Sequence, residues 1–367
     1  MKIAILIPSL HVGGIRRVFI NLAEGFSVND LEVDLVVVNI QEADHLDFVS
    51  QLPSNINIVN LNARRALTSI LPLMRYLRQE RPNVLLAVSE PVNLMAIWAR
   101  MLTHVPTRIA ASIVNTPSAS DQEVINRREK VYPLLTKWFY PRADYVIAIA
   151  ESIREDLHEF IHLPLGKITT INTPVVTESL FERAGEAINH PWFNDDSPPI
   201  ILGVGRFVPQ KDLLTLIQAF AEVRQERPAR LVILGDGQER QKLEALVGEL
   251  GLQDDVWMPG FVGNLPFMKQ SDVFVLSSIF EGLPTVLIEA LALSPAIVST
   301  DCPGGIGEIL NDGECGLIVP MRDPKSLAQA IIQSLDDPID TALLRKRAND
   351  FSMQSIVDKY KIVLGLE

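Results

Sequence analysis

Short apolar runs alternate with longer amphipathic stretches along most of the chain. The runs have the composition of strands buried on both faces, and the stretches between them have the periodicity of helices. This alternation predicts an α/β fold in which helices wind on both faces of a parallel sheet. In the first half, strands are expected at 3–7, 31–38, 56–61, 84–87, 108–114, 145–148 and 168–171. Helices are expected at 15–26, 70–79, 92–102, 121–139 and 152–160, the last with Ser152 as its cap.

The alternation stops at about residue 177 and restarts at residue 199. Prolines and an acidic pair fill this interval, so 177–198 is expected to be a linker between two Rossmann-like domains, 1–176 and 199–351. Such sheets bind ligands at the carboxyl ends of their strands, so a cleft between the domains is the expected site. In the second domain, strands are expected at 200–204, 230–234, 256–258, 273–276, 296–299 and 316–319. Helices are expected at 213–225, 239–250, 265–270, 284–293 and 324–335. A terminal helix is expected at 352–364.

One stretch, 280–289, joins a predicted strand end to a helix start. Gly282 and Pro284 precede a helix-forming segment, and Pro284 is expected at the first helical position. A helix N-terminus offers free N–H groups and partial positive charge to an anion such as phosphate. Glu281 and Glu289 would flank that anion and suit hydroxyl groups on either side, which together describe a nucleotide sugar. The alternative is a plain helix start with two surface glutamates.

A second loop at a predicted strand end, 203–212, carries two cations among glycines. Arg206 and Lys211 are five residues apart in this loop. A guanidinium makes a forked contact with phosphate and an ammonium supplies a point charge. The two therefore suit a diphosphate and the charge that develops on it when it leaves. The alternative is a pair of solvated loop charges.

The composition of the chain limits which binding partners and which cell compartment are expected. The 367 residues are enough for two domains, and the formal net charge of −12 argues against nucleic acid, whose phosphates need a basic face. Residues 1–176 carry 17 basic and 17 acidic residues, so the first half is relatively basic. Cys302 and Cys315 give no disulfide framework and are typical of a reducing cytosol. No apolar stretch has the length of a membrane span, so a cytoplasmic protein is expected.

The Gly-Arg-x4-Lys-Asp and Glu-x7-Glu patterns occur in one order with further short motifs, at 10–17, 234–237, 258–262, 299–305 and 312–316. Together they resemble the retaining glycosyltransferases of family 4, which have the two-domain GT-B fold. The resemblance covers nearly the whole chain. It implies a GT-B enzyme whose terminal helix, about 352–367, crosses back onto the first domain.

The resemblance also implies a donor site, residue by residue. Arg206 and Lys211 would bind the diphosphate and assist its departure. Glu281 would hydrogen-bond the donor sugar, and Glu289 would bind the ribose hydroxyls. Backbone groups would complete the site at Gly13 and Gly14 near the diphosphate, at Gly282, Leu283, Pro284 and Thr285 near the sugar and phosphates, and at Val262 near the base.

Members of this family usually transfer with retention and without a metal ion. The sequence contains no Asp-x-Asp pattern, and no metal or cofactor is expected beyond the nucleotide-sugar substrate. No side chain need be a nucleophile if the acceptor attacks from the front face and the leaving phosphate helps to remove its proton. Glu281 as a covalent nucleophile remains the alternative.

The chain departs from the family on the acceptor side. Many relatives carry a His in the segment that here reads 111–117, and the matching place is Val114, followed by Asn115. Asn115 is therefore the acceptor-side candidate. His11 and His104 are not at the family position, and each stays an alternative as a catalytic base.

The segment 127–142 mixes basic and aromatic residues, so it is expected either to lie on an anionic membrane or to be a core helix. The expected function is transfer of a hexose or N-acetylhexosamine from a nucleotide-diphosphate sugar, UDP foremost. The expected acceptor is a glycan or a lipid-linked molecule of surface polysaccharide synthesis, and the expected location is the cytoplasm, with the inner face of the cell membrane as the alternative. A sugar-nucleotide 2-epimerase and a non-catalytic nucleotide-sugar-binding homologue are the alternatives.

Overall fold

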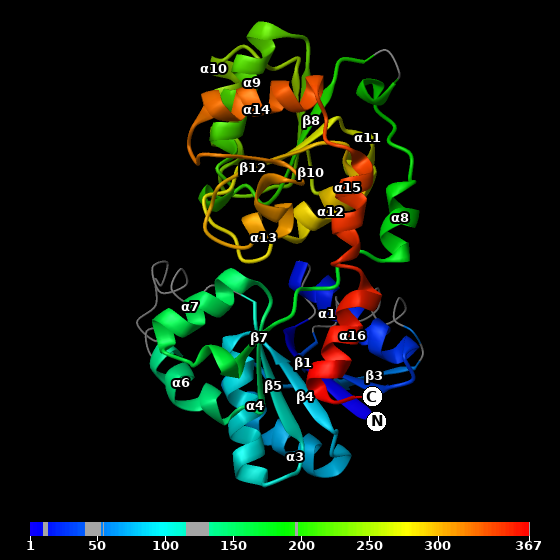
Figure 1. Cartoon of the computed structure of the whole chain (residues 1–367), viewed down its shortest axis with the longest axis vertical. Coiled ribbons are helices and arrows are strands. Elements are labelled where there is room, and N and C mark those ends of the chain that lie inside the picture. The colour runs from blue at the N-terminus through cyan, green and yellow to red at the C-terminus, as the bar shows by residue number, and fades with distance from the viewer. Residues whose placement is uncertain (10–13, 41–52, 54, 115–131, 195–196, 367) are drawn as a thin grey trace. The chain divides into compact units, whose positions relative to one another are not determined.

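The structure, a computed structural model, describes residues 1–9, 14–40, 53, 55–114, 132–194 and 197–366. Contacts within the chain divide it into two units (Figure 1). The first comprises Met1–Val175 and Ser352–Glu367, and the second comprises Val176–Phe351.

The first unit is built on a parallel sheet with the strand order β3-β2-β1-β4-β5-β6-β7. The apolar runs are its strands, and those at the centre, such as β4, are buried along their whole length. The strands are β1 (Lys2–Ser9), β2 (Glu32–Asn39), β3 (Ile56–Asn60), β4 (Val84–Val88), β5 (Arg108–Ile113), β6 (Tyr145–Ala148) and β7 (Ile168–Thr170). The helices are α1 (Gly14–Val28), α3 (Ile70–Glu80), α4 (Glu90–Thr103), α6 (Tyr132–Phe139), α7 (Glu151–Ile161) and α16 (Met353–Leu364).

The terminal helix α16 packs against α1 within this first unit (Figure 1). The ring of Tyr360 meets the edge of Phe26, with centroids 6.1 Å apart. A Cβ at Gly25 would lie 2.4 Å from Val357 Cγ2, so the missing side chain lets the two helices approach closely. The Oγ of Ser352 accepts a hydrogen bond from the backbone of the first turn and caps the helix.

The second unit has a parallel sheet with the order β10-β9-β8-β11-β12-β13. On one of its faces α9 and α14 pack side by side, and Leu216, Phe220 and Ile331 belong to the core beneath them. The strands are β8 (Ile200–Val204), β9 (Arg230–Leu234), β10 (Val256–Gly260), β11 (Val273–Leu276), β12 (Ile297–Thr300) and β13 (Leu317–Val319). The helices are α8 (Glu178–Ala184), α9 (Leu213–Glu226), α10 (Arg240–Glu249), α11 (Asn264–Gln270), α12 (Thr285–Leu293), α13 (Ile306–Leu310), α14 (Pro324–Asp336) and α15 (Thr341–Asn349).

The predicted doubly wound α/β class is confirmed for both units. In each sheet the chain starts at a central strand, winds to one edge and then returns to the other side. The strand order therefore reverses between β1 and β4 in the first unit and between β8 and β11 in the second. Ligands in open α/β sheets bind at the carboxyl ends of the strands at such a switch point.

In the segment expected as a linker, 177–198, residues 177–194 are instead folded onto the second unit. It contains α8, which Thr177 caps by accepting from the Leu180 backbone, and α8 packs against α11. Further along, the ring of His190 stacks on Trp257 with centroids 3.9 Å apart. The helix α8 was not predicted, because it has only seven residues and the segment is rich in prolines and acidic residues.

Other element boundaries also differ from the expectation. The helix α7 begins at Glu151 with Ala150 as its N-cap, so Ser152 lies inside the first turn and its side chain does not cap it. The helix α15 had not been predicted. Of the helix expected at 121–139, the structure shows α6, and 121–131 lie outside the described residues. Within the described residues, no helix combines the length and apolar character needed to cross a membrane.

Candidate active site

The predicted cationic and acidic loops meet at the switch point of the second sheet. β8 and β11 are hydrogen-bonded neighbours, with Val273 paired to Ile201. The loop after β8 carries Lys211, and the loop after β11 carries Glu281. Because both strands are parallel, both loops leave the sheet at its carboxyl edge. The sheet therefore brings together two residues that are 70 positions apart in the chain.

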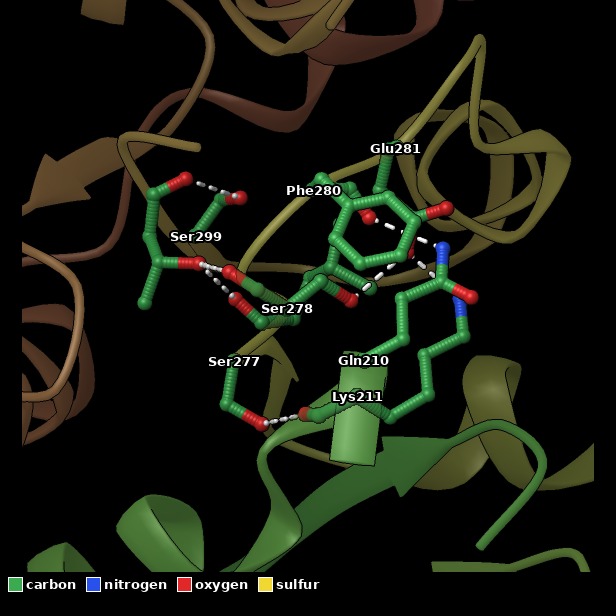
Figure 2. A network of polar contacts seen from close by, with 9 residues as sticks. Gln210, Lys211, Ser277, Ser278, Phe280, Glu281 and Ser299 are labelled. Carbon is green, nitrogen blue, oxygen red and sulfur yellow. Dashed lines mark hydrogen bonds and ion pairs between the residues drawn. The ribbon is translucent and has the colours of Figure 1, made fainter. Parts of the chain in front are cut away.

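Lys211 and Glu281 form a largely buried ion pair in this place (Figure 2). The Nζ of Lys211 donates to Oε1 of Glu281 at 2.5 Å, and the two side chains are 14% and 8% exposed. The Oγ of Ser278 donates to the same oxygen at 2.6 Å. Both donors reach Oε1, so they orient the carboxylate from one side. A charged pair shielded from water interacts more strongly than one at the surface.

Hydrogen bonds to backbone carbonyls hold the two loops together beside this pair (Figure 2). The backbone N–H of Ile279 donates to the carbonyl of Gln210 at 2.9 Å, and Gln210 Nε2 donates to the carbonyl of Phe280 at 2.9 Å. The Oγ of Ser277 donates to the carbonyl of Lys211 at 2.8 Å. The loops therefore form one connected structure, which fixes the backbone from which Lys211 and Glu281 project.

Two glycines permit close backbone approaches that shape the same loops. Gly235, after β9, has φ +136°, and a Cβ there would lie 1.9 Å from the carbonyl oxygen of Gly205. Gly304 has φ +131°, and a Cβ there would lie 2.3 Å from the carbonyl oxygen of Glu281. No other residue type fits either position without a backbone shift. The glycines in these turns therefore allow the loops around the site to pack closely against one another.

The residue after Arg206 anchors the cationic loop to the next one. Phe207 is fully buried, and its backbone N–H donates to the carbonyl of Asp236 at 2.8 Å. The guanidinium of Arg240 lies 5.2 Å from the centre of the Phe207 ring and donates to Asp236 Oδ1 at 2.8 Å. Arg206 itself is exposed, and its guanidinium makes no ion pair or hydrogen bond with any described residue. The structure therefore brings Lys211, and not Arg206, into the polar network.

The helix start that follows Glu281 differs slightly from the expectation. Pro284 is the N-cap residue of α12, with φ −69° and ψ 106°, and Thr285 is the first helical residue. Pro284 supplies no capping side chain, so the first-turn N–H groups keep their capacity to bind an anion. Leu283 is buried, whereas Gly282 and Thr285 are half-buried.

The two glutamates of the Glu-x7-Glu pattern have different partners. Glu289 lies in the second turn of α12 and is 6% exposed, and its Oε2 accepts from Asn264 Nδ2 at 2.6 Å. Asn264 is the first residue of α11. Glu281 is thus tied to the loop after β8, whereas Glu289 is tied to the helix after β10. The hypothesis of two plain surface glutamates is wrong, because both side chains are buried.

Sequence profiles of two glycosyltransferase families match the chain. The profile described as Glycosyltransferase Family 4 matches residues 12–179, and that described as Glycosyl transferases group 1 matches residues 186–352. The N-acetylgalactosamine-N,N'-diacetylbacillosaminyl-diphospho-undecaprenol 4-alpha-N-acetylgalactosaminyltransferase of Campylobacter jejuni is 31% identical over 377 aligned positions, covering 99% of this chain and 100% of that protein. The chain belongs to family 4, group 1, of the glycosyltransferases. The predicted family and enzyme class are therefore confirmed.

Solved structures support the fold of this glycosyltransferase. HepE of Anabaena in complex with UDP superposes with a TM-score of 0.78 at 16% identity, and the match covers 100% of each chain. Sucrose-phosphate synthase of Thermosynechococcus elongatus gives a TM-score of 0.76 at 19% identity, again over 100% of each chain. At these identities the likeness shows the fold alone, and it confirms the GT-B prediction.

The first unit of the glycosyltransferase carries the remaining predicted residues. Gly13 and Asn115 lie outside the described residues, and Gly14 is the first residue of α1. Val114, which the sequence analysis matched to the family's His, directly follows β5 and is buried. His104 ends α4 in the left-handed conformation, with φ 53°.

Sequence analysis missed a carboxylate at the switch point of the first sheet. Glu90 opens α4 directly after β4, and Ser89 before it has φ 83°, which is unusual for a residue with a side chain. Burial and the negative charge of Asp156 on α7 raise the pKa of the Glu90 carboxyl. The available signal was a Ser-Glu-Pro sequence directly after a predicted strand.

Two further features concern the chemistry available to the glycosyltransferase. Burial and the nearby charge of Glu281 raise the pKa of Cys302 to about 12, which keeps this thiol protonated and unreactive. In the part of the chain that the structure describes, no three His, Cys, Asp or Glu side chains come together in a way that suits a metal ion.

Sequence analysis also missed Ser278, Gln210 and Asn264, because their roles depend on contacts between distant loops.

Proposed function

We propose that this enzyme transfers a hexose or N-acetylhexosamine with retention from a UDP-sugar to a glycan or lipid-linked acceptor of surface polysaccharide synthesis. The observation that carries this proposal is the buried Lys211–Glu281 pair at the switch point of the second sheet. It places a cation and a carboxylate side by side at the edge of an uncapped helix N-terminus. These are the groups that a sugar attached to a diphosphate needs.

Lys211 acts on the diphosphate in this proposal. Its ammonium is held in place by Glu281, and its backbone carbonyl is held by Ser277. A cation that is already positioned stabilises the charge that builds on a departing diphosphate without reorganising during the reaction. The exposed Arg206 adds a forked contact to the same phosphates when the donor is bound.

Glu281 acts on the donor sugar. Its Oε1 already accepts from Lys211 and Ser278, and Oε2 accepts from no other described residue. We propose that Oε2 accepts from a hydroxyl of the sugar and so sets its orientation. The two donors occupy Oε1, so this oxygen is not free to attack the sugar as a nucleophile. This favours front-face transfer over a covalent glycosyl-Glu281 intermediate.

The nucleotide part of the donor is proposed to bind along the same carboxyl edge of the sheet. Glu289 receives the ribose hydroxyls, and the backbone near Val262, whose side chain is 43% exposed, receives the base. The choice of UDP is supported by the complex of HepE with UDP. The choice of acceptor is supported by the Campylobacter jejuni relative, which acts on a diphospho-undecaprenol substrate.

We further propose transfer without a metal ion, at the cytoplasmic face of a membrane. The charge of the diphosphate is met by Lys211 and Arg206 in this scheme. Contact with an anionic membrane is supported by α6, where Leu134 and Trp138 are 58% and 61% exposed beside the exposed Lys137. The basic residues of 127–131 lie outside the described residues.

The test is a transfer assay with purified enzyme. Radiolabelled UDP-N-acetylgalactosamine, UDP-N-acetylglucosamine, UDP-glucose and UDP-galactose are each offered with undecaprenyl-diphosphate-linked glycans, in EDTA and in Mg²⁺. The proposal expects a lipid-linked product with an α-linkage, by NMR, at equal rates in both buffers. UDP release that needs no acceptor would indicate an epimerase instead. Binding of the donors without release or transfer would indicate a non-catalytic homologue.

A further inference from the structure

The carboxylate of Glu289 is held by a side chain from another helix. Asn264 Nδ2 donates to Glu289 Oε2 at 2.6 Å, and the two residues belong to the packed helices α11 and α12. Glu289 is 6% exposed. A hydrogen bond to an ionised acceptor is stronger than one between neutral groups, and exclusion of water strengthens it further. The bond therefore restricts rotation of the carboxylate.

The side chain of Asn264 has no helix-capping role that would explain its orientation. The N-cap of α11 is Gly263, and no side chain caps this helix. The other contact of Nδ2 is the sulfur of Met268, at 3.8 Å, and a thioether is a weak acceptor. The contact with the Glu289 carboxylate is thus the one that sets where the amide points.

The position of Asn264 also links two parts of the proposed donor site. Phe261 and Val262, just before it in the chain, are 75% and 43% exposed at the carboxyl end of β10. Exposed apolar side chains at a strand's carboxyl edge suit the face of a base. Asn264 thus connects this loop to the carboxylate proposed for the ribose.

We infer that Asn264 is a positioning residue that makes the site selective for ribonucleotides over deoxyribonucleotides. The inference rests on the proposed function of the donor site. In it, the Asn264 amide holds one oxygen of Glu289 and so presents the carboxylate to the ribose hydroxyls in a single orientation. Asn264 itself does not touch the reacting atoms, and its effect falls on nucleotide binding.

Isothermal titration calorimetry tests this inference by measuring how tightly the 367-residue protein binds UDP and 2′,3′-dideoxy-UDP. The wild type is expected to bind UDP more tightly than the dideoxy compound. Asn264→Ala is expected to weaken UDP binding by about tenfold, the size typical of a hydrogen bond to a charged group, and to leave dideoxy-UDP binding unchanged. A loss of packing or folding would weaken both ligands alike, so the ratio of the two affinities separates the roles.

Two further variants strengthen the test. Asn264→Asp has nearly the same shape but sets a second carboxylate against Glu289, so it is expected to weaken UDP binding more than Asn264→Ala does. In a Glu289→Gln background, Asn264→Ala is expected to have no further effect on the ratio. Gln270→Ala, an exposed position at the other end of α11, is the matched control and should leave both affinities unchanged.

The outcomes separate the inference from the function beneath it. If the wild type binds no UDP, GDP or ADP, the proposed donor site is wrong and the inference is wrong with it. If the wild type binds UDP but Asn264→Ala keeps the wild-type ratio of UDP to dideoxy-UDP affinity, the inference is overturned and the proposed function stands. Selective loss of UDP binding supports both.

Discussion

The two sheets share one strand order apart from the additional edge strand β7 of the first, yet their switch points carry different chemistry. At the second, the loops after β8 and β11 are joined through Lys211, Glu281 and Ser278. At the first, the described residues include the carboxylate of Glu90, with which no described side chain pairs, and the apolar Val114. One topology thus supports an organised ionic site in the second unit, whereas the described residues of the first unit show no such ion pair at the corresponding switch point. The fold supplies the place, and the loops supply the function.

The first unit does bury a charged network, but at the amino ends of its strands. Lys2 Nζ lies 3.0 Å from Asp34 Oδ2 and 2.9 Å from Glu80 Oε2. Tyr76 donates to Asp34 at 2.6 Å, and Asn57 donates to it at 3.0 Å. This network lies at the edge of the sheet where ligands do not bind, so we assign it to stability. The comparison predicts that breaking the two networks has separable effects on activity and on folding.

The largest effect is expected from Lys211→Met. Loss of the cation should lower kcat about 10²- to 10³-fold, the range for removal of one electrostatic donor to a developing charge. It should also lower the unfolding free energy, because the buried Glu281 carboxylate loses its cation. Steady-state kinetics and urea denaturation measure the two effects.

A second substitution separates these effects. Adding Glu281→Gln to Lys211→Met should recover most of the stability and none of the activity. Lys269→Met, at an exposed position on α11, is the control and should change neither. Recovery of activity in the double variant would contradict a direct role for this pair.

The charge network of the first unit should show the opposite pattern. Asp34→Ala leaves Lys2, Tyr76 and Asn57 without their shared acceptor, and the Asp34 side chain is only 1% exposed. The unfolding free energy is expected to fall by about 3 kcal/mol, while kcat stays near the wild-type value. Differential scanning calorimetry with an activity assay at 25 °C gives both quantities. A large loss of kcat in folded protein would contradict the assignment to stability.

A smaller effect is expected where packing, not charge, shapes the active loops. Gly235→Ala sets a Cβ 1.9 Å from the Gly205 carbonyl at φ +136°, so the loop after β8 must shift. We expect about 2 kcal/mol of lost stability and reduced activity together. Gly166→Ala has no atom within 4 Å of the added Cβ and serves as the control. Equal stabilities for the two variants would show that the loop is more tolerant than this contact implies.

Local patterns in the sequence predicted the strands of both sheets and the loops that carry the site residues. Buried parallel strands are continuous apolar runs, so β1, β4, β8 and β11 could be located without knowing what they pack against. The loops that carry Lys211 and Glu281 were found in the same way, because each directly follows such a run.

The pairings inside the site could not be predicted in this manner. Lys211 reaches Glu281, and Asn264 reaches Glu289, only because strand order and helix packing bring distant loops together. Nothing in the segment around Asn264 marks it as a partner for a carboxylate. The helix α8 was missed for a different reason, since seven residues are too few for the periodicity to stand out.

The smallest effect concerns the Glu90 carboxylate at the first switch point, for which the described residues offer no side-chain partner. Burial and the charge of Asp156 raise the pKa of Glu90. Between the pKa of the unfolded chain, about 4.3, and the raised value, the folded protein binds a proton that the unfolded chain has lost. Stability contributed by this group therefore falls as pH rises through that window. Glu90→Gln removes the free-energy cost of ionising this buried carboxyl, so the variant should be more stable than the wild type at pH 8, and the difference should vanish near pH 4.

Urea denaturation across this pH range measures the difference in unfolding free energy, with the exposed Glu155→Gln on α7 as the control. A Glu90→Gln variant that is less stable at pH 8 would mean that the carboxylate has a partner in the folded protein and that the first switch point is more organised than the described residues show.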